Sequence, residues 1–284
     1  MGIFVHVLSS SKAIMIIDTH VHIGNMIGFH LTEDDVIYSM KKYGISHSIV
    51  SSLNAAEFDH HLDPIPQKYL HSQTECLDDV LSLAKKYPDK ISAAVWVRPF
   101  SERADDALYK AIDTNRQYIK AVKFHPYHSN VPFDDKRSES FIELAEHYGL
   151  PVVTHTGGSD CASCIRVYRM AKKYPDTKFV MVHMGLGTDN NEAIKLISQL
   201  PNLYGDTTWV PVKSTLKLIK TAGIDKVFFG SDSPIDGPDT YFCNRSGERS
   251  LYQQYFNEFK DMVSQEEYDR IMYKNAASVF QINL

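Results

Sequence analysis

The chain has 284 residues, of which 43% are hydrophobic and 23% charged, and its formal net charge is −5. This composition is typical of a globular protein with a substantial core, and the lack of a Lys/Arg cluster argues against binding to nucleic acid or to an anionic membrane surface. No apolar run approaches the roughly 20 residues of a membrane span. Four cysteines do not make a disulfide scaffold, so we expect a cytoplasmic protein.

The first 14 residues are predicted to lie outside the folded core. They contain a short apolar run, Ile3 to Leu8, without a basic region before it, which argues against a signal peptide. We expect an extension, or an upstream start, over residues 1–14. A single domain is predicted over residues 15–284, because no linker or charge run suggests a second one.

The first predicted strand, headed by Met15, ends in His20-Val21-His22 just before Gly24. Side chains alternate along a strand, so Asp18, His20 and His22 are expected to share one face. Two imidazoles on one face can bind a single metal ion. Alone the motif is weak, because 13 histidines in this chain could produce one such pair by chance.

Helices and strands alternate over the rest of the chain. Apolar periodicity, capping residues and Gly or Pro stops predict helices over residues 31–43, 74–87, 102–118, 139–148, 163–174, 191–200, 213–222, 249–263 and 265–280. Strands are predicted between them over residues 45–53, 91–97, 121–125, 151–155, 178–183, 202–208 and 226–230.

Eight strands that alternate with helices predict a single (β/α)8 TIM barrel of the α/β class. An open doubly wound sheet is the alternative. It is less favoured, because no G-x-G-x-x-G motif follows the first strand.

Polar residues stand where these strands end. Parallel strands buried on both faces are otherwise almost wholly apolar. In a barrel these ends converge on one mouth, where active sites are built. The polar residues are His20 and His22 on the first strand, Arg98 after the third, Lys123 and His125 on the fourth, His155 on the fifth, His183 on the sixth and Asp232 after the eighth. Packing does not explain so many at one end, so together they predict a metal site.

Several short motifs, in this order, resemble the amidohydrolase superfamily. They are IIDTHVHIG, AVKFHP, PVVTHTG, FVMVHMG, FFGSDSP and a terminal KNAASVF. The most similar branch holds metal-dependent TIM-barrel hydrolases and decarboxylases of the aminocarboxymuconate-semialdehyde type. The resemblance covers the chain from Met15 onward.

The resemblance implies roles for individual residues. His20, His22, His155 and Asp232 would bind one divalent metal, which we expect to be Zn²⁺. His183 would stay off this metal and handle water or protons. Some relatives bind a second metal through the fourth strand, where this chain has Lys123 and His125.

This ligand set implies a metal-dependent hydrolase of a small amide, ester or lactone. The metal would lower the pKa of water from about 15.7 towards about 7, and Asp232 would take up the proton and later deliver it to the leaving group. The same ligands also suit non-oxidative decarboxylation of a small carboxylic acid, with His183 as the proton donor. The spacing of the motifs does not separate the two reactions.

Arg98 is open to two interpretations. It could bind a substrate carboxylate through two parallel hydrogen bonds, or form a structural ion pair at the barrel rim.

Other features are weaker. Cys161 and Cys164 have C-x-x-C spacing without a second pair. His60, His61 and His128 lie in predicted loops, where solvated histidines are usual and a contact with substrate is the less favoured alternative. The segment from Tyr241 to Arg249 is either a lid or specificity loop or a polar connection. The substrate and the oligomeric state stay open, a homodimer being the commonest arrangement of soluble oligomers.

Overall fold

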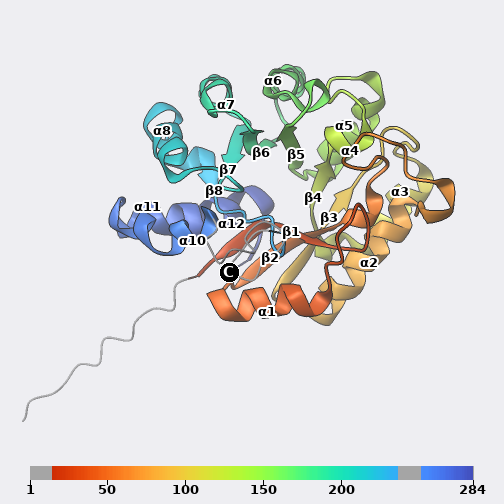
Figure 1. The fold of residues 1–284 in the computed structure, drawn as a ribbon, viewed down its shortest axis with the longest axis horizontal. Coiled ribbons are helices and arrows are strands. Elements are labelled where there is room, and N and C mark those ends of the chain that lie inside the picture. Colours follow the sequence, from red (N-terminus) through yellow and green to blue (C-terminus); the bar gives the residue numbers. More distant parts are fainter. Residues whose placement is uncertain (1–14, 236–250, 284) are drawn as a thin grey trace, which may run out of the picture.

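The fold is a (β/α)8 TIM barrel, seen in a computed structural model that describes residues 15–235 and 251–283 (Figure 1). The predicted extension over residues 1–14 and the predicted lid segment from Tyr241 to Arg249 lie outside the described residues. Across the described residues, no helix is both long and apolar enough to span a bilayer.

Eight strands form one parallel sheet in the order of the chain. They are β1 (Ile17–Ile23), β2 (His47–Ser52), β3 (Ile91–Trp96), β4 (Ile119–Phe124), β5 (Val152–Gly157), β6 (Phe179–Leu186), β7 (Leu203–Asp206) and β8 (Val227–Phe228). The sheet curls back on itself, because the segment after β8 pairs with β1. His22 N donates to Ser233 O at 2.8 Å, and Asp232 N donates to His20 O at 2.9 Å. These hydrogen bonds, which close the barrel, therefore hold Asp232 next to His20 and His22.

Helices surround the sheet, as the sequence predicted (Figure 1). They are α1 (Glu33–Tyr43), α2 (Gln73–Lys86), α3 (Asp106–Asn115), α4 (Pro126–Ser129), α5 (Lys136–Tyr148), α6 (Cys164–Lys173), α7 (Asn191–Ile197), α8 (Val212–Ala222), α10 (Leu251–Phe256), α11 (Gln265–Asp269) and α12 (Asn275–Phe280). Local chemistry sets their ends. Thr32 and Asp35 form a capping box at the start of α1, and Gly44 ends the helix with a φ of 67°.

Three helical predictions were wrong at their ends or in their continuity. The helix predicted from residue 102 begins at Asp106, because the Asp105 side chain accepts the Leu108 N–H at 2.9 Å and caps it there. The segment over 249–263 contains α10 and then a short 3₁₀ turn, Glu258–Asp261. The helix over 265–280 is broken by a π-helical turn, Arg270–Lys274, between α11 and α12.

The core has two main layers. The larger layer packs the outer face of the sheet against the helices. The smaller layer fills the barrel interior with strand residues such as Ile17, Ile49 and Val153, and Val279 and Phe280 of α12 pack against it. Apolar side chains fill this interior, and the polar residues of the predicted site lie beyond it, at the carboxyl-terminal ends of the strands.

Strand β1 does not keep a strict alternation of faces. Ile17 packs inside the barrel, whereas Val21 packs outside against the helices. Between Asp18 and Val21 the register with β2 shifts, as at a β-bulge. Such an irregularity turns the neighbouring side chains, and here it includes His20 and precedes His22.

A buried histidine far from the barrel mouth makes stability depend on pH. Burial lowers the pKa of His47 from 6.5 to about 4, and its Nε2 lies 2.9 Å from Ser92 Oγ. Protonation therefore favours the unfolded chain. The His47 contribution to stability is fully present above pH 6.5 and is lost as the pH falls towards 4, by about 3 kcal/mol.

We therefore expect His47→Gln to lose less stability than the wild type between pH 7 and pH 4.5. Urea unfolding at both pH values measures this difference. His147→Gln, at an exposed position on α5, is the control and should keep the full pH dependence. Equal pH dependence of His47→Gln and the wild type would contradict this prediction.

Candidate metal centre and pocket

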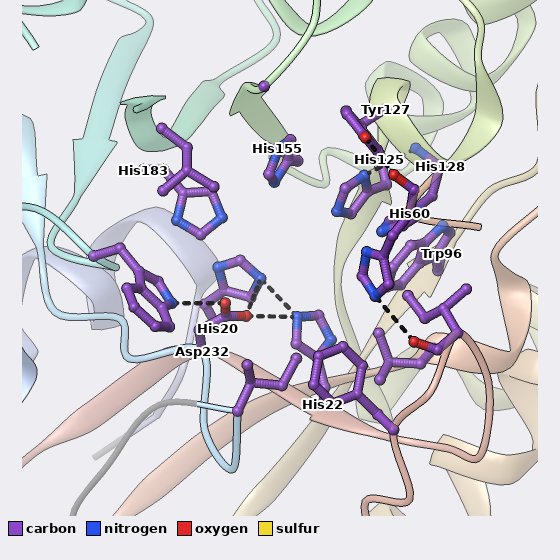
Figure 2. A pocket seen from close by; sticks show the side chains of 17 residues that line it. His20, His22, His60, Trp96, His125, Tyr127, His128, His155, His183 and Asp232 are labelled. Atoms are coloured by element: carbon purple, nitrogen blue, oxygen red, sulfur yellow. Dashed lines mark hydrogen bonds and ion pairs between the residues drawn. The ribbon is translucent and has the colours of Figure 1, made fainter. Parts of the chain in front are cut away.

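A cavity of about 310 Å³ opens at the carboxyl ends of the strands (Figure 2). Seven histidines line it together with aromatic and aliphatic side chains. The histidines are His20, His22, His60, His125, His128, His155 and His183. Five of them are strand-end histidines that the sequence predicted to converge. The remaining two are His60, in the loop after β2, and His128, on α4.

His20, His22 and Asp232 form a compact group of potential metal ligands. The Nε2 atoms of the two histidines lie 2.9 Å apart. Asp232 Oδ1 lies 3.0 Å from His22 Nε2 and 3.5 Å from His20 Nε2. All three residues are buried. Two imidazole nitrogens and a carboxylate oxygen that converge in this way form a donor set suited to a divalent metal ion.

Neighbouring groups orient these ligands. His22 Nδ1 lies 3.0 Å from Ser51 Oγ, and His20 Nδ1 lies 3.6 Å from Asp206 Oδ2 without a hydrogen-bond partner among the described residues. Both Nδ1 atoms therefore face away from the group, which leaves the Nε2 lone pairs directed into it. Such outer groups help to set the ring orientation of metal-binding histidines.

The protonation states fit metal binding. Burial lowers the pKa of His20 and of His22, so both imidazoles are neutral. Burial alone would raise the pKa of Asp232, but the adjacent His20 and His22 hold it well below its ordinary value. Neutral nitrogens and an ionised carboxylate are the forms that bind Zn²⁺ and similar ions.

Two buried aspartates, which sequence reasoning missed as site residues, fix the backbone around the ligands. Asp18 accepts hydrogen bonds from the His20 and Ser231 N–H groups at 3.2 and 3.1 Å, and so ties β1 to the segment after β8. Asp206 accepts the His183 N–H at 3.0 Å. Burial raises the pKa of each aspartate to about 7. Asp206 ends β7. The search for polar residues at the ends of strands, which we call the strand-end rule, could therefore have found it.

His183 presents a basic nitrogen to the pocket. Its Nδ1 donates to the Thr208 carbonyl oxygen at 3.1 Å, so its proton is on Nδ1 and its Nε2 is unprotonated. Burial lowers its pKa to about 4, which keeps the ring neutral near pH 7. The ring lies 5.6 Å from that of His20, between centroids. It is therefore placed beside the ligand group, outside it.

His155 and His125 lie in a stack of rings. The His155 and His125 centroids are 4.0 Å apart at 15°, and Trp96 stacks on the other side of His125 at 5.2 Å and 7°. Among the described residues, neither histidine joins the group of His20, His22 and Asp232. A role of His155 as a metal ligand stays a prediction.

Lys123 is buried behind the ligands and does not line the cavity. Its Nζ lies 3.0 Å from His20 Nε2. Burial lowers its pKa to about 8, against the opposing effect of Asp232 and Asp206. A second metal on Lys123 and His125 stays a prediction.

Arg98 does not line the cavity either. It donates through Nη1 to Glu102 Oε1 at 2.7 Å and to the carbonyl oxygen of His71. The strand-end rule placed it near the mouth, but the following loop supplies a partner that turns it away. Cys161 and Cys164 are free thiols outside the cavity lining.

Trp209 is a residue of the cavity lining that no pattern in the sequence indicated. It follows β7, lines the cavity, and donates its indole N–H to Asp232 Oδ2 at 2.9 Å (Figure 2). This hydrogen bond occupies one carboxylate oxygen and leaves Oδ1 for the metal.

We expect Trp209→Phe to weaken zinc binding by about 10- to 100-fold, because the partners of metal ligands typically contribute that much to affinity. Competition with a chromophoric chelator measures the affinity. Trp96→Phe is the matched control, since Trp96 also lines the cavity but does not contact Asp232 through an observed hydrogen bond. Equal affinities of the two variants would contradict a role of the indole N–H.

Comparisons with known proteins agree with this architecture. A search of curated proteins finds no match. Solved structures match over nearly the whole chain, with 94% or more of this chain covered, but their low identity shows the fold alone.

Three of these structures illustrate the range of activities that their names give. The probable 2-pyrone-4,6-dicarboxylic acid hydrolase of Acinetobacter baumannii, with citric acid bound, has a TM-score of 0.66 and 15% identity, with 94% of this chain and 99% of that one covered. The 4-oxalomesaconate hydratase of Rhodopseudomonas palustris has a TM-score of 0.65 and 16% identity, with 94% and 96% covered. The dihydroxybenzoic acid decarboxylase of Polaromonas sp. JS666, with bound manganese and the inhibitor 2-nitroresorcinol, has a TM-score of 0.68 and 14% identity, with 95% and 97% covered.

The family evidence comes from the sequence itself. The model of the amidohydrolase family matches residues 17–282, which include every strand of the barrel and every predicted ligand. The chain belongs to the amidohydrolase family.

Proposed function

We propose that this protein is a metal-dependent hydrolase of a small amide, ester or lactone. The observation that carries the proposal is the placement of His183 Nε2, a neutral and unprotonated base, in the same cavity as His20, His22 and Asp232. We propose Zn²⁺ as the metal, because it accepts mixed nitrogen and oxygen ligands. When bound, it polarises the scissile carbonyl and lowers the pKa of water.

The side chains then have separate tasks. His183 holds the attacking water and accepts its proton through Nε2, because its Nδ1 proton is committed to the Thr208 carbonyl. The ionised Asp232, besides binding the metal, would relay the proton that His183 accepts to the leaving group. Its Oδ2 is held by Trp209, so the carboxylate cannot rotate away.

The charge of the cavity favours a neutral substrate. Its described lining residues include no lysine and no arginine, and much of the wall is apolar, with Ile27, Phe29, Leu53 and Ile235. Apart from the metal, the described lining therefore has no cationic side chain that would neutralise a substrate carboxylate. An uncharged amide, ester or lactone can enter the cavity without the free-energy cost of burying a charged group.

Non-oxidative decarboxylation of a small carboxylic acid is the second candidate. The observation that favours it is the number of aromatic side chains in the cavity lining, which suit a flat ring. They are Phe29, Trp96, Tyr127 and Trp209. A structurally similar protein carries the name dihydroxybenzoic acid decarboxylase. In this reaction the metal would have to bind the carboxylate, because no basic side chain of the described lining does so.

Product analysis separates the two reactions. The zinc-loaded protein is incubated with a panel of lactones, aryl esters and anilides and with a panel of aromatic acids. We expect acid formation from the first panel and no CO₂ from the second. CO₂ release without hydrolysis would contradict the proposal and support the decarboxylase. A cytoplasmic location and a homodimer stay predictions from the sequence.

A further inference from the structure

Two histidines, His60 in the loop after β2 and His128 on α4, line the cavity on a wall that the proposed reaction does not use. In Figure 2 they lie with Tyr127 on the side of the pocket away from His183. Their ring centroids are 5.1 Å apart. A series of ring contacts leads from the metal ligands to this wall, through His22, Trp96, His125, His128 and His60.

Main-chain carbonyl groups fix the tautomer of each histidine. His60 Nε2 lies 2.9 Å from the Ile27 carbonyl oxygen, and His128 Nδ1 lies 2.8 Å from the Phe58 carbonyl oxygen. A carbonyl oxygen only accepts, so the proton must be on the ring nitrogen that faces it. With one proton on each ring, the other nitrogen, His60 Nδ1 or His128 Nε2, is a hydrogen-bond acceptor. We call these two atoms the acceptor pair.

The acceptor pair is held in place before any ligand binds. His128 O accepts the N–H groups of Glu57 and Phe58 at 2.9 and 2.8 Å, and Tyr127 donates its hydroxyl to His60 O at 2.8 Å. These bonds join the loop after β2 to α4. The His60 bond to Ile27 adds the loop after β1. Three loops therefore meet at the two rings, which is the arrangement of a pre-formed binding wall.

Neither acceptor atom has a hydrogen-bond partner among the described residues, although both side chains line the cavity. His125, nearer the metal ligands, differs: its Nδ1 accepts the His128 N–H at 3.3 Å, so its Nε2 carries the proton. The acceptor pair thus presents lone pairs, and no N–H donor, to a bound group. A carboxylate there would meet lone pairs with its own, whereas a hydroxyl or amino group would donate to them.

We propose that His60 and His128 form a subsite that binds the end of the substrate remote from the metal centre by accepting hydrogen bonds from its hydroxyl or amino groups. This inference rests on the proposed function, because it takes the cavity to be the substrate site. It narrows the substrate to an uncharged ring or short chain that carries such donors opposite the scissile bond.

Two small probes test the subsite without turnover. Resorcinol carries two hydroxyl donors, and 1,3-dimethoxybenzene has the same ring without a donor. Their binding to the zinc-loaded protein is measured by ligand-observed NMR. We expect resorcinol to bind about tenfold more tightly, which is the effect of one or two neutral hydrogen bonds.

Variants then assign the effect to the acceptor pair. His60→Leu, at an exposed position, should weaken resorcinol binding about fivefold and leave the binding of the ether unchanged. His61→Leu is the matched control, because His61 is an exposed neighbour that does not line the cavity, and it should bind both probes as the wild type does. Histidine ¹⁵N NMR should find the His60 proton on Nε2 and the His128 proton on Nδ1.

The opposite tautomers, or equal discrimination between the probes in His60→Leu and the wild type, would overturn the subsite. The proposed function fails in a different way. If no amide, ester or lactone is hydrolysed while the probes are still discriminated, the hydrolase is contradicted and the acceptor pair stands. If hydrolysis is found but the probes bind equally, only the subsite is wrong.

Discussion

His22→Ala is expected to release the bound metal and to reduce kcat/KM by about 10³-fold. His22 Nε2 lies within 3.0 Å of both His20 Nε2 and Asp232 Oδ1, so its loss opens one side of the ligand group. A catalytic metal contributes several kcal/mol of transition-state stabilisation, and each 1.36 kcal/mol corresponds to a tenfold change in rate. Metal content and kcat/KM are measured on the same preparation.

His147→Ala provides the control for this experiment. His147 lies exposed on α5, away from the cavity, and its replacement should change neither metal content nor rate. If His22→Ala retained one metal per chain with unchanged kcat/KM, the ligand group would have no part in metal binding.

His183→Asn is expected to lower kcat by about 10² to 10⁴-fold while the protein keeps its metal. This range is the usual contribution of a positioned general acid or base. Asparagine cannot replace the basic Nε2, but the ligand atoms of His20, His22 and Asp232 are untouched. Steady-state kinetics and metal analysis check the two halves of the prediction. Unchanged turnover would place His183 outside the chemistry, and loss of the metal would make it a ligand.

The barrel could be predicted because its signals are local and repeated. Each strand is a short apolar run, and each helix has an amphipathic face with its own cap, as at Thr32 and Gly44 of α1. The predictions failed where a contact distant in the sequence, or a local irregularity, decides the structure. The bulge in β1 and the π-helical turn over Arg270–Lys274 are of this kind.

The polar residues at the strand ends gave the candidate ligands and their neighbours but not the rest of the cavity lining. His20, His22, His125, His155, His183 and Asp232 all line the cavity. For Arg98 the structure shows the second of the two interpretations, a structural ion pair, because Glu102, four residues later, pairs with it. Trp209 escaped prediction. For His60 and His128 the sequence offered a substrate contact only as the less favoured alternative to a solvated side chain. The positions of all three side chains depend on tertiary hydrogen bonds. Loop geometry is the information that one sequence does not contain.

The central claim is that one divalent metal, held by His20, His22 and Asp232, is required for turnover. The most direct test measures metal content and hydrolytic activity together while a chelator removes the metal and added Zn²⁺ restores it. We expect one ion per chain in the active protein, with activity falling and returning in proportion to occupancy. Full activity in metal-free protein would contradict the claim.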